Sequence, residues 1–319
     1  MRSTVNTNHT RQYASRLIAL YLAFTPLLGY SIGPADPVPH YRHPVVFCRG
    51  RAAEHVDSKI WIMEDDGSAL RQLTVGESYD DHPSLYSDLR HILYAEFASK
   101  DFDVSAGSRL IKLDVYTGTR EVVGEVAGCT LHHAQISPIG DLLVYSRNCG
   151  QRFSEWVGWG PGAYEVNTWA VHGVAVPGGI IFQHEKNWTE DGADAARESS
   201  IVRLWGHGRG SKIVFLTDDR HLNRRPAVSP DGRLIAWQTN QEANNDEIFL
   251  ANIDGSNARN ITNSPGYDGH PWFSRDGKTI VFESDRTGAM EIWKISLNTN
   301  EVTQLTFGGK GWTSNRPRM

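Results

Sequence analysis

The stretch "YDGHPWFSRDGKTIVFESDRTGAMEIWKIS", residues 267–296, decides the fold of this chain. Apolar residues alternate with polar ones on both sides of Asp276-Gly277, which predicts two strands joined by a tight turn. A third alternating segment follows after a loop. A hairpin with one extra strand is too small to be stable by itself, so the rest of the chain must supply its packing partners.

The same pattern recurs along the chain. Residues 224–240, "RRPAVSPDGRLIAWQTN", match residues 269–285, "GHPWFSRDGKTIVFESD", almost position by position, and Pro226 lies 45 residues before Pro271. Two further copies lie at 81–97 and 132–148. The chain is therefore built from repeats, and the first stretch packs against its own copies.

A second pattern follows most of these copies. It consists of an alternating strand, a turn with Gly or Asn, and a strand that commonly ends in Leu-Thr or Ile-Thr. It occupies 58–74, 108–123, 200–217, 246–262 and 290–306. One unit is thus four short antiparallel strands in about 45 residues, and repeats of this length and content indicate a β-propeller.

We expect an all-β protein, a six-bladed β-propeller of four-stranded antiparallel blades. The blades are expected at 44–48 with 58–74, 80–123, 130–171, 172–217, 221–262 and 268–306. The fourth blade is degenerate, with "VAVPGGIIFQHE" in place of its first hairpin. The first blade lacks its leading strand, which either the C-terminal "NRPRM" or residues 36–42 would supply.

The N-terminus differs from the repeats. Arg2, Arg11 and Arg16 precede the apolar run "LIALYLAFTPLLGYSIG", and small residues follow it. This pattern predicts a secretory signal peptide over residues 1–35 and a propeller over 36–319, hence a periplasmic or secreted protein with no membrane span after cleavage. The alternative is that the segment is retained as an N-terminal anchor. The net charge of −5 without a basic block excludes a nucleic-acid partner.

Two of the three cysteines flank a predicted hairpin. Cys129 and Cys149 each lie ten residues from Ile139, which belongs to the turn "SPIG". They meet at the open end of the hairpin, so we expect a disulfide between them. Cys48 is left over and is expected in the core of a strand.

The repeats resemble those of the TolB-like β-propeller family. The residues that carry the resemblance are Pro271, Phe273-Ser274, Asp276-Gly277, Ile280, Phe282-Glu283-Ser284-Asp285-Arg286, Gly288, Glu291-Ile292-Trp293 and Leu305-Thr306. The resemblance covers residues 44–317 and implies the propeller fold and a periplasmic or secreted location. TolB has an α/β domain before its propeller, whereas here the repeats follow the predicted signal peptide directly, so we expect a stand-alone propeller. The resemblance does not imply one function, because related propellers serve many functions.

One position of the repeat is a candidate ligand-binding ring. Most copies of the repeat have a proline near the start of the first strand, and the residue before it is a histidine or an arginine. With the corresponding residue of the copy that has alanine instead, these residues are His82, His133, Arg225, His270 and Arg316. Equivalent positions in a propeller surround the central channel, so we expect these side chains to ring one channel mouth. The alternative is that they only order the neighbouring turns.

A tryptophan-rich segment is a second candidate. Residues 146–169 read as a long insertion between two strands on the same face as this ring, and they include Trp156, Trp159 and Tyr164. Exposed aromatic rings there would stack on sugar rings or grip a peptide. The alternative is a small local core.

The histidines also permit a metal. His82, His133 and His270 are candidate ligands for a divalent transition metal, with Gln151 nearby in sequence. Oligogalacturonate lyases are similar propellers with a histidine-based metal site near the axis, which makes a metal-dependent polysaccharide lyase one alternative function. No Gly-x-Ser-x-Gly elbow or phosphate-binding fingerprint supports other chemistry.

The sequence therefore predicts a binding module. We expect a monomeric protein that recognises a protein or a saccharide on its channel-mouth face, with no cofactor and no catalysis of its own. The metal-dependent lyase and a purely structural assembly module are the alternatives.

Overall fold

The computed structural model describes residues 39–51, 57–99, 107–150, 153–168, 170–185, 198–206, 210–242 and 245–319. The predicted signal peptide, residues 1–35, lies outside the described residues and stays a prediction. Residues 39–319 form one compact unit. Among the described residues, no helix is both long and apolar enough to span a membrane.

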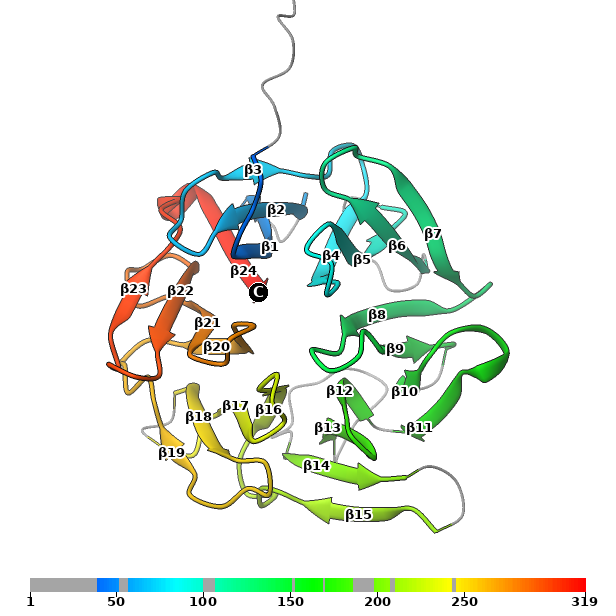
Figure 1. The fold of residues 1–319 in the computed structure, drawn as a ribbon, viewed down its shortest axis with the longest axis vertical. Coiled ribbons are helices and arrows are strands. Elements are labelled where there is room, and N and C mark those ends of the chain that lie inside the picture. Colours follow the sequence, from blue (N-terminus) through cyan, green and yellow to red (C-terminus); the bar gives the residue numbers. More distant parts are fainter. Residues whose placement is uncertain are drawn as a thin grey trace, which may run out of the picture. The chain divides into compact units, whose positions relative to one another are not determined.

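Six four-stranded antiparallel sheets form a ring around a central axis, as Figure 1 shows. The prediction of an all-β, six-bladed propeller is confirmed. Blade 1 consists of β24 (Trp312–Arg318), β1 (Pro44–Arg51), β2 (Lys59–Glu64) and β3 (Arg71–Gln72). Blade 2 consists of β4 (Tyr79–Leu85), β5 (His91–Phe97), β6 (Ser108–Asp114) and β7 (Arg120–Glu125). Blade 3 consists of β8 (Thr130–Ile136), β9 (Leu143–Asn148), β10 (Phe153–Val157) and β11 (Tyr164–Thr168).

The remaining blades follow the same order from the axis outward. Blade 4 consists of β12 (Ala170–Val176), β13 (Gly179–Glu185), β14 (Ser199–Trp205) and β15 (Lys212–Phe215). Blade 5 consists of β16 (Asn223–Val228), β17 (Leu234–Thr239), β18 (Glu247–Asn252) and β19 (Arg259–Asn260). Blade 6 consists of β20 (Asp268–Phe273), β21 (Thr279–Ser284), β22 (Glu291–Ser296) and β23 (Val302–Gln304). Two 3₁₀ turns, η2 (Gly160–Gly162) and η3 (Gly309–Gly311), join strands.

The repeated sequence motifs each satisfy a backbone group. In the turn of blade 6, the Ser274 hydroxyl donates to Asp276 Oδ1 at 2.6 Å and accepts from the Thr279 N–H at 3.0 Å. At the Leu-Thr ending, Thr306 Oγ1 accepts from the Ile292 N–H at 2.8 Å. The threonines at 74, 217 and 262 accept equivalent bonds. The motifs recur because several blades have the same turn and the same outer-strand connection to stabilise.

The C-terminal strand closes the ring. β24 pairs antiparallel with β1, from Val46 opposite Arg318 to Arg51 opposite Trp312. Of the two closures that the sequence left open, the C-terminal one is present, and β24 is longer than the expected "NRPRM". Blade 1 therefore takes one strand from the end of the chain and three from its beginning.

Blade 3 differs from the prediction. Residues 146–169 are not an insertion, because β10 and β11 within this segment are the third and fourth strands of the blade. The expected boundary between blades 3 and 4 was also too late, since β12 already begins at Ala170. The degenerate stretch in blade 4 does form a hairpin, β12 to β13, as expected.

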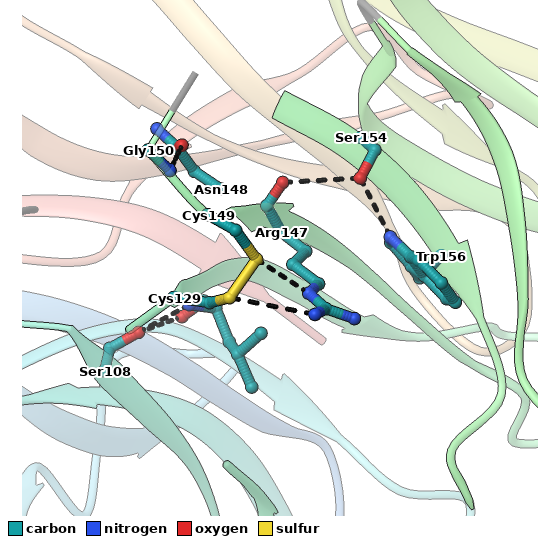
Figure 2. Close-up of a disulfide and its surroundings, with 9 residues drawn as sticks. Ser108, Cys129, Arg147, Asn148, Cys149, Gly150, Ser154 and Trp156 are labelled. Carbon is teal, nitrogen blue, oxygen red and sulfur yellow. Dashed lines mark hydrogen bonds between the residues drawn. A yellow bond between two sulfur atoms is a disulfide. The ribbon is translucent and has the colours of Figure 1, made fainter. Parts of the chain in front are cut away.

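A disulfide joins Cys129, which directly precedes β8, to Cys149 after β9. These are the cysteines that the sequence pairs across the open end of the β8–β9 hairpin. Figure 2 shows the Arg147 side chain beside both sulfurs, with its Nε 3.0 Å from Cys149 Sγ. Cys48 is a free, buried thiol in β1.

Candidate functional site

Each blade places one side chain at the axis by the same backbone device. The innermost strand of every blade carries a register shift against its partner, and one non-glycine residue there has φ between 48° and 54°. The six residues are His82, His133, His172, Arg225, His270 and Arg316. A positive φ costs a non-glycine residue on the order of 1–2 kcal/mol, so this bulge is a feature that the surrounding ring enforces.

Five of these six positions are the predicted ring, and the sixth was missed. His172 in β12 holds the equivalent position in blade 4, where Gly173 replaces the usual proline. The residues lie midway along their strands, so they fill the channel itself rather than ring its mouth. His82 and His270 are each 3% exposed, and His172 is 6% exposed.

Four imidazoles contact one another at the axis. The ring centroids of His133 and His172 are 3.8 Å apart and stacked, and those of His82 and His133 are 4.4 Å apart. The centroid of His270 lies 6.1 Å from those of both His82 and His172. Residues from four blades, up to 188 positions apart in the sequence, thus form one cluster.

Oxygen groups orient three of the imidazoles. His82 Nδ1 lies 2.8 Å from Asp81 Oδ2, and His270 Nδ1 lies 2.7 Å from Glu283 Oε1. A carboxylate oxygen only accepts, so both Nδ1 atoms carry the proton and both Nε2 atoms carry a lone pair. His133 Nδ1 lies 3.3 Å from the Ser146 hydroxyl.

Several nitrogens of the cluster have no hydrogen-bond partner within the described part of the chain. They are Nε2 of His82, Nε2 of His270 and Nδ1 of His172, and all three are buried. A buried polar atom without a partner costs on the order of 1–3 kcal/mol. The cluster therefore contains buried imidazole nitrogens whose hydrogen-bonding capacity the described residues do not use.

Burial keeps these imidazoles neutral. It lowers the pKa of His82 to about 4, with the Arg316 guanidinium adding to the effect against the attraction of Asp81. The pKa values of His133, His172 and His270 also lie well below the usual histidine value because of burial and neighbouring cationic groups. Burial raises the pKa of Asp81, but Arg316 and His82 lower it more, so this carboxylate is ionised.

The two arginines of the ring connect blades. Arg316 Nη1 lies 2.6 Å from Asp81 Oδ1, which joins β24 to blade 2. Arg225 Nη1 donates to Gln238 Oε1 at 2.6 Å and to the Tyr267 hydroxyl at 2.9 Å. Both guanidiniums thus have partners, and the strain of the bulge is balanced by contacts between blades.

The candidate metal ligands are regrouped by the structure. One donor nitrogen each from His82, His133 and His172 lies within 4.8 Å of the others. His270, which the sequence grouped with His82 and His133, stands beside this group. Gln151 lies outside the described residues.

The predicted aromatic residues lie away from this cluster. Trp156 in β10 is half-buried, and its Nε1 donates to the Ser154 hydroxyl at 2.8 Å. Tyr164 in β11 packs on the core of blades 3 and 4, and Trp159 is 39% exposed with its ring 5.4 Å from that of Tyr145. The structure brings the histidines and arginines together but does not bring these aromatics to them.

A cavity of about 350 Å³ opens on the face of the ring that carries the turns between the first and second strands of the blades. It is lined by the start of β1, by the first turns of blades 2 and 6, and by the C-terminus, which Figure 1 places near the centre. The lining residues are Arg42, His43, Pro44, Asp65, Leu89, Ser274, Arg275, Asp276, Thr279 and Met319. Sequence reasoning missed this site because none of these residues stands out within its own repeat.

Comparisons with known proteins agree with the repeats. Residues 209–318 match the family described as the TolB beta propeller domain. The Tol-Pal system protein TolB of Bordetella pertussis is 40% identical over 57 residues, which is 18% of this chain and 13% of that protein. The protein TolB homolog of Chlorobaculum tepidum is 37% identical over 100 residues, or 31% of this chain and 23% of that protein. The matches thus span less than a quarter of these relatives.

Solved structures show the same fold. TolB from Acinetobacter baumannii superimposes with a TM-score of 0.69 at 17% identity, over 86% of this chain and 66% of that one. A putative TolB from Agrobacterium tumefaciens gives 0.61 at 17% identity, over 87% and 98%. Identities this low establish the fold alone. With its six closed blades, and with residues 209–318 matching the family model, the propeller of this chain is similar to the TolB beta propeller domain.

Proposed function

We propose that this protein is a periplasmic module that binds a protein partner through the cavity on the turn face of the ring. The observation that carries the proposal is the cavity itself, defined by Arg42, Leu89, Arg275 and Met319 among others. Turns from three blades converge there on a rigid scaffold. Such a concave site, formed by loops of a stable fold, is where propellers and similar folds bind partners.

The chemistry of the lining suits a peptide segment. Pro44, Leu89 and Met319 supply apolar surface, while Arg275 and Asp276 supply charges of both signs. A cavity of about 350 Å³ accepts one or two side chains and leaves the flanking segment on the rim. The partner we propose is therefore a protein that inserts a short segment with an apolar side chain between charged neighbours.

The relatives support a protein partner and a periplasmic location. Those matched in sequence include proteins named for the Tol-Pal system. Family resemblance and the predicted signal peptide both point to the periplasm. A saccharide would need exposed aromatic platforms, but His43 contributes the one aromatic ring among the residues that line this cavity.

We propose no catalysis for this module. A polysaccharide lyase needs a metal that a polymer can reach, whereas His82, His172 and His270 are buried and His133 is half-buried. The cavity, in turn, holds no pair of carboxylates or histidines in contact with each other among the described residues. The histidine cluster at the axis is the feature that the lyase alternative requires, but the cavity adds no catalytic group to it.

Site-specific photocrosslinking tests the proposal. A photoreactive residue replaces Arg42, whose side chain lines the cavity, in protein expressed in its source organism. The control position is Arg233, an exposed residue of the equivalent turn in blade 5. We expect a discrete protein adduct at position 42 and none at position 233.

A charge reversal sharpens the experiment. Arg275→Glu is expected to reduce the adduct at position 42 at least about tenfold, since one opposed charge pair at an interface is worth more than about 1.4 kcal/mol. Arg233→Glu leaves the adduct unchanged. Equal adducts at positions 42 and 233, or no adduct at 42, would overturn the proposal.

A further inference from the structure

We propose that the axis of the propeller is a metal site, in which His82, His133 and His172 hold one divalent transition-metal ion. The donor nitrogens of these three side chains lie within 4.8 Å of one another. They come from three consecutive blades and from the same bulge position in each. The inference is independent of the protein partner proposed above, because the cluster and the cavity are different sites.

The spacing is close to what one ion requires. Zinc-to-imidazole bonds of about 2.1 Å place the nitrogens of a tetrahedral site about 3.4 Å apart. The observed group is at most 4.8 Å wide. Small rotations of the imidazoles about their side-chain bonds therefore bring the three nitrogens to coordination distance without movement of the strands.

The hydrogen bonds around the cluster favour ligation. A metal-binding histidine usually donates its other ring N–H to a carboxylate or a similar oxygen, which fixes the tautomer. His82 makes this bond to Asp81 at 2.8 Å, and its Nε2 is buried with no partner among the described residues. His172 Nδ1 is likewise buried and unpartnered in this part of the chain. An ion would satisfy both atoms at once.

The charges near the cluster select the kind of metal. Arg225, Arg316 and Arg318 lie near it, and Asp81 and Glu283 supply the nearby carboxylates. The three proposed ligands are neutral imidazoles, so they offer a metal nitrogen atoms and no anionic oxygen. Imidazole bonding favours Zn²⁺, Cu²⁺, Ni²⁺ or Co²⁺ and disfavours Ca²⁺ and Mg²⁺.

His270 occupies the remaining side of the cluster. Its Nε2 is buried without a partner among the described residues, but its ring centroid is 6.1 Å from those of His82 and His172. The structure thus assigns three ligands and leaves His270 as a neighbour. A water or a small anion fits the fourth coordination position of a three-histidine ion.

Metal titration of the purified full chain tests the site. Protein stripped with EDTA is titrated with Co²⁺, whose visible absorption reports tetrahedral nitrogen ligation, and with Zn²⁺, Ca²⁺ and Mg²⁺ by calorimetry. We expect one equivalent of Co²⁺ or Zn²⁺ to bind and to raise the melting temperature, because the ion binds the folded state only. Ca²⁺ and Mg²⁺ give no heat and no shift.

Substitutions identify the ligands. His172→Gln and His133→Gln each remove one imidazole and are expected to weaken Co²⁺ binding at least about 100-fold, more than a loss in the surrounding hydrogen bonds would. His184→Gln is the matched control, since His184 lies in β13 of blade 4 and its ring faces Phe215 at 6.1 Å. Circular dichroism of the metal-free variants shows whether each is folded.

The outcomes are distinct. Stoichiometric Co²⁺ binding that is lost in the folded His133→Gln or His172→Gln protein but kept in His184→Gln supports the site. The proposal is overturned if wild-type protein binds no Co²⁺ or Zn²⁺, or if the axis variants bind as well as wild type. His133 is more exposed than the other two, so its variant serves if His172→Gln does not fold.

Discussion

Glu283 Oε2 in blade 6 accepts a hydrogen bond of 2.7 Å from the backbone N–H of Arg316 in β24. Its other oxygen accepts from the Tyr267 hydroxyl at 3.0 Å and from His270 Nδ1 at 2.7 Å. Arg225 is held in the same way, because its N–H donates to Gln183 Oε1 in blade 4 at 3.0 Å. A side chain of one blade thus fixes the strained residue of the next blade.

Removal of this carboxylate should weaken the closed ring. Glu283→Ala removes the acceptor of His270 Nδ1 and of the Arg316 N–H. The Tyr267 hydroxyl keeps Gln238 Oε1 as a partner. We expect the substitution to lower the free energy of unfolding by about 2–4 kcal/mol. Glu283→Gln keeps one acceptor oxygen and should cost less. Urea unfolding measures both, with Glu301→Ala in an exposed turn as the control. A Glu283→Ala protein as stable as the control would contradict this role.

The C-terminal strand should be required for stability. Truncation after Gly311 removes β24 and leaves the edge of β1 unpaired, so we expect the melting temperature to fall by about 10 °C or more. A permuted chain in which residues 312–319 directly precede residue 42 restores a hairpin with β1. This permuted chain should recover most of the loss. If truncation has no effect on melting, the ring is not closed by this strand.

The disulfide should stabilise blade 3. It closes a loop with a sequence separation of 20 residues, and the replacement of both Cys129 and Cys149 by Ser is expected to cost about 3 kcal/mol. The same loss should follow reduction of the wild-type protein. Cys48→Ser is the comparison, since Cys48 forms no disulfide. Reduction should shift the urea midpoint of wild type but not that of the double variant, which has no disulfide. Equal shifts in both proteins would contradict the prediction.

Cys48 should not react in the folded protein. Burial raises the pKa of this thiol well above its usual value, and the neighbouring Asp81 raises it further, so hardly any thiolate forms. Iodoacetamide at pH 8 should not label the native protein. After unfolding in the absence of a reductant, which keeps the disulfide intact, it should label one cysteine per chain. Labelling of the native protein at the rate of a free cysteine peptide would show that Cys48 is accessible.

The contribution of Glu155 to stability should fall as the pH rises from 6.5 to 8. Burial raises the pKa of Glu155 to about 8, whereas it is near 4.3 in the unfolded chain. The native state therefore holds a proton that the unfolded state has released, and this contribution falls by about 1–2 kcal/mol over the interval. The stability contributed by protonated Glu155 is fully present below the pKa of the unfolded state, and it is lost as the pH rises through the pKa of the folded state. The buried histidines, whose pKa values are lowered, act in the opposite direction, so the effect of Glu155 is measured against a variant.

Glu155→Gln isolates this effect. The amide keeps an acceptor for the Gly173 N–H, which lies 2.5 Å from Glu155 Oε1, and a donor toward Ser146. The histidine contribution is the same in both proteins, so we expect the free energy of unfolding of wild type relative to this variant to fall by about 1–2 kcal/mol between pH 6.5 and 8. The same pH slope in wild type and variant would assign the dependence to another group.

The repeats predicted the architecture because they are local. The Ser-x-Asp-Gly turn and the Leu-Thr ending each satisfy backbone groups within one blade, so their spacing reveals strands and blade number without any distant contact. The closing strand and the β8–β9 disulfide could also be predicted from the sequence. Blade 1 lacked its first strand, and the two cysteines flank one predicted hairpin.

The errors came where these local signals are absent. Blade 3 has no Leu-Thr ending, so β10 and β11 looked like an insertion and Trp156 like an exposed platform. His172 was missed because Gly173 stands where four other blades have proline and because the rest of this hairpin is degenerate, although "VHGVAV" still shows the histidine before an alternating strand. The cavity depends on turns from three blades, and no single repeat contains that information.

Equivalent residues of the blades meet at one axis, and the metal proposed there can be located by anomalous diffraction from a crystal grown with stoichiometric Co²⁺. We expect a single strong anomalous peak on the axis of a six-bladed ring, within bonding distance of His82, His133 and His172. A peak elsewhere, or His82, His133 and His172 directed away from a common centre, would contradict it.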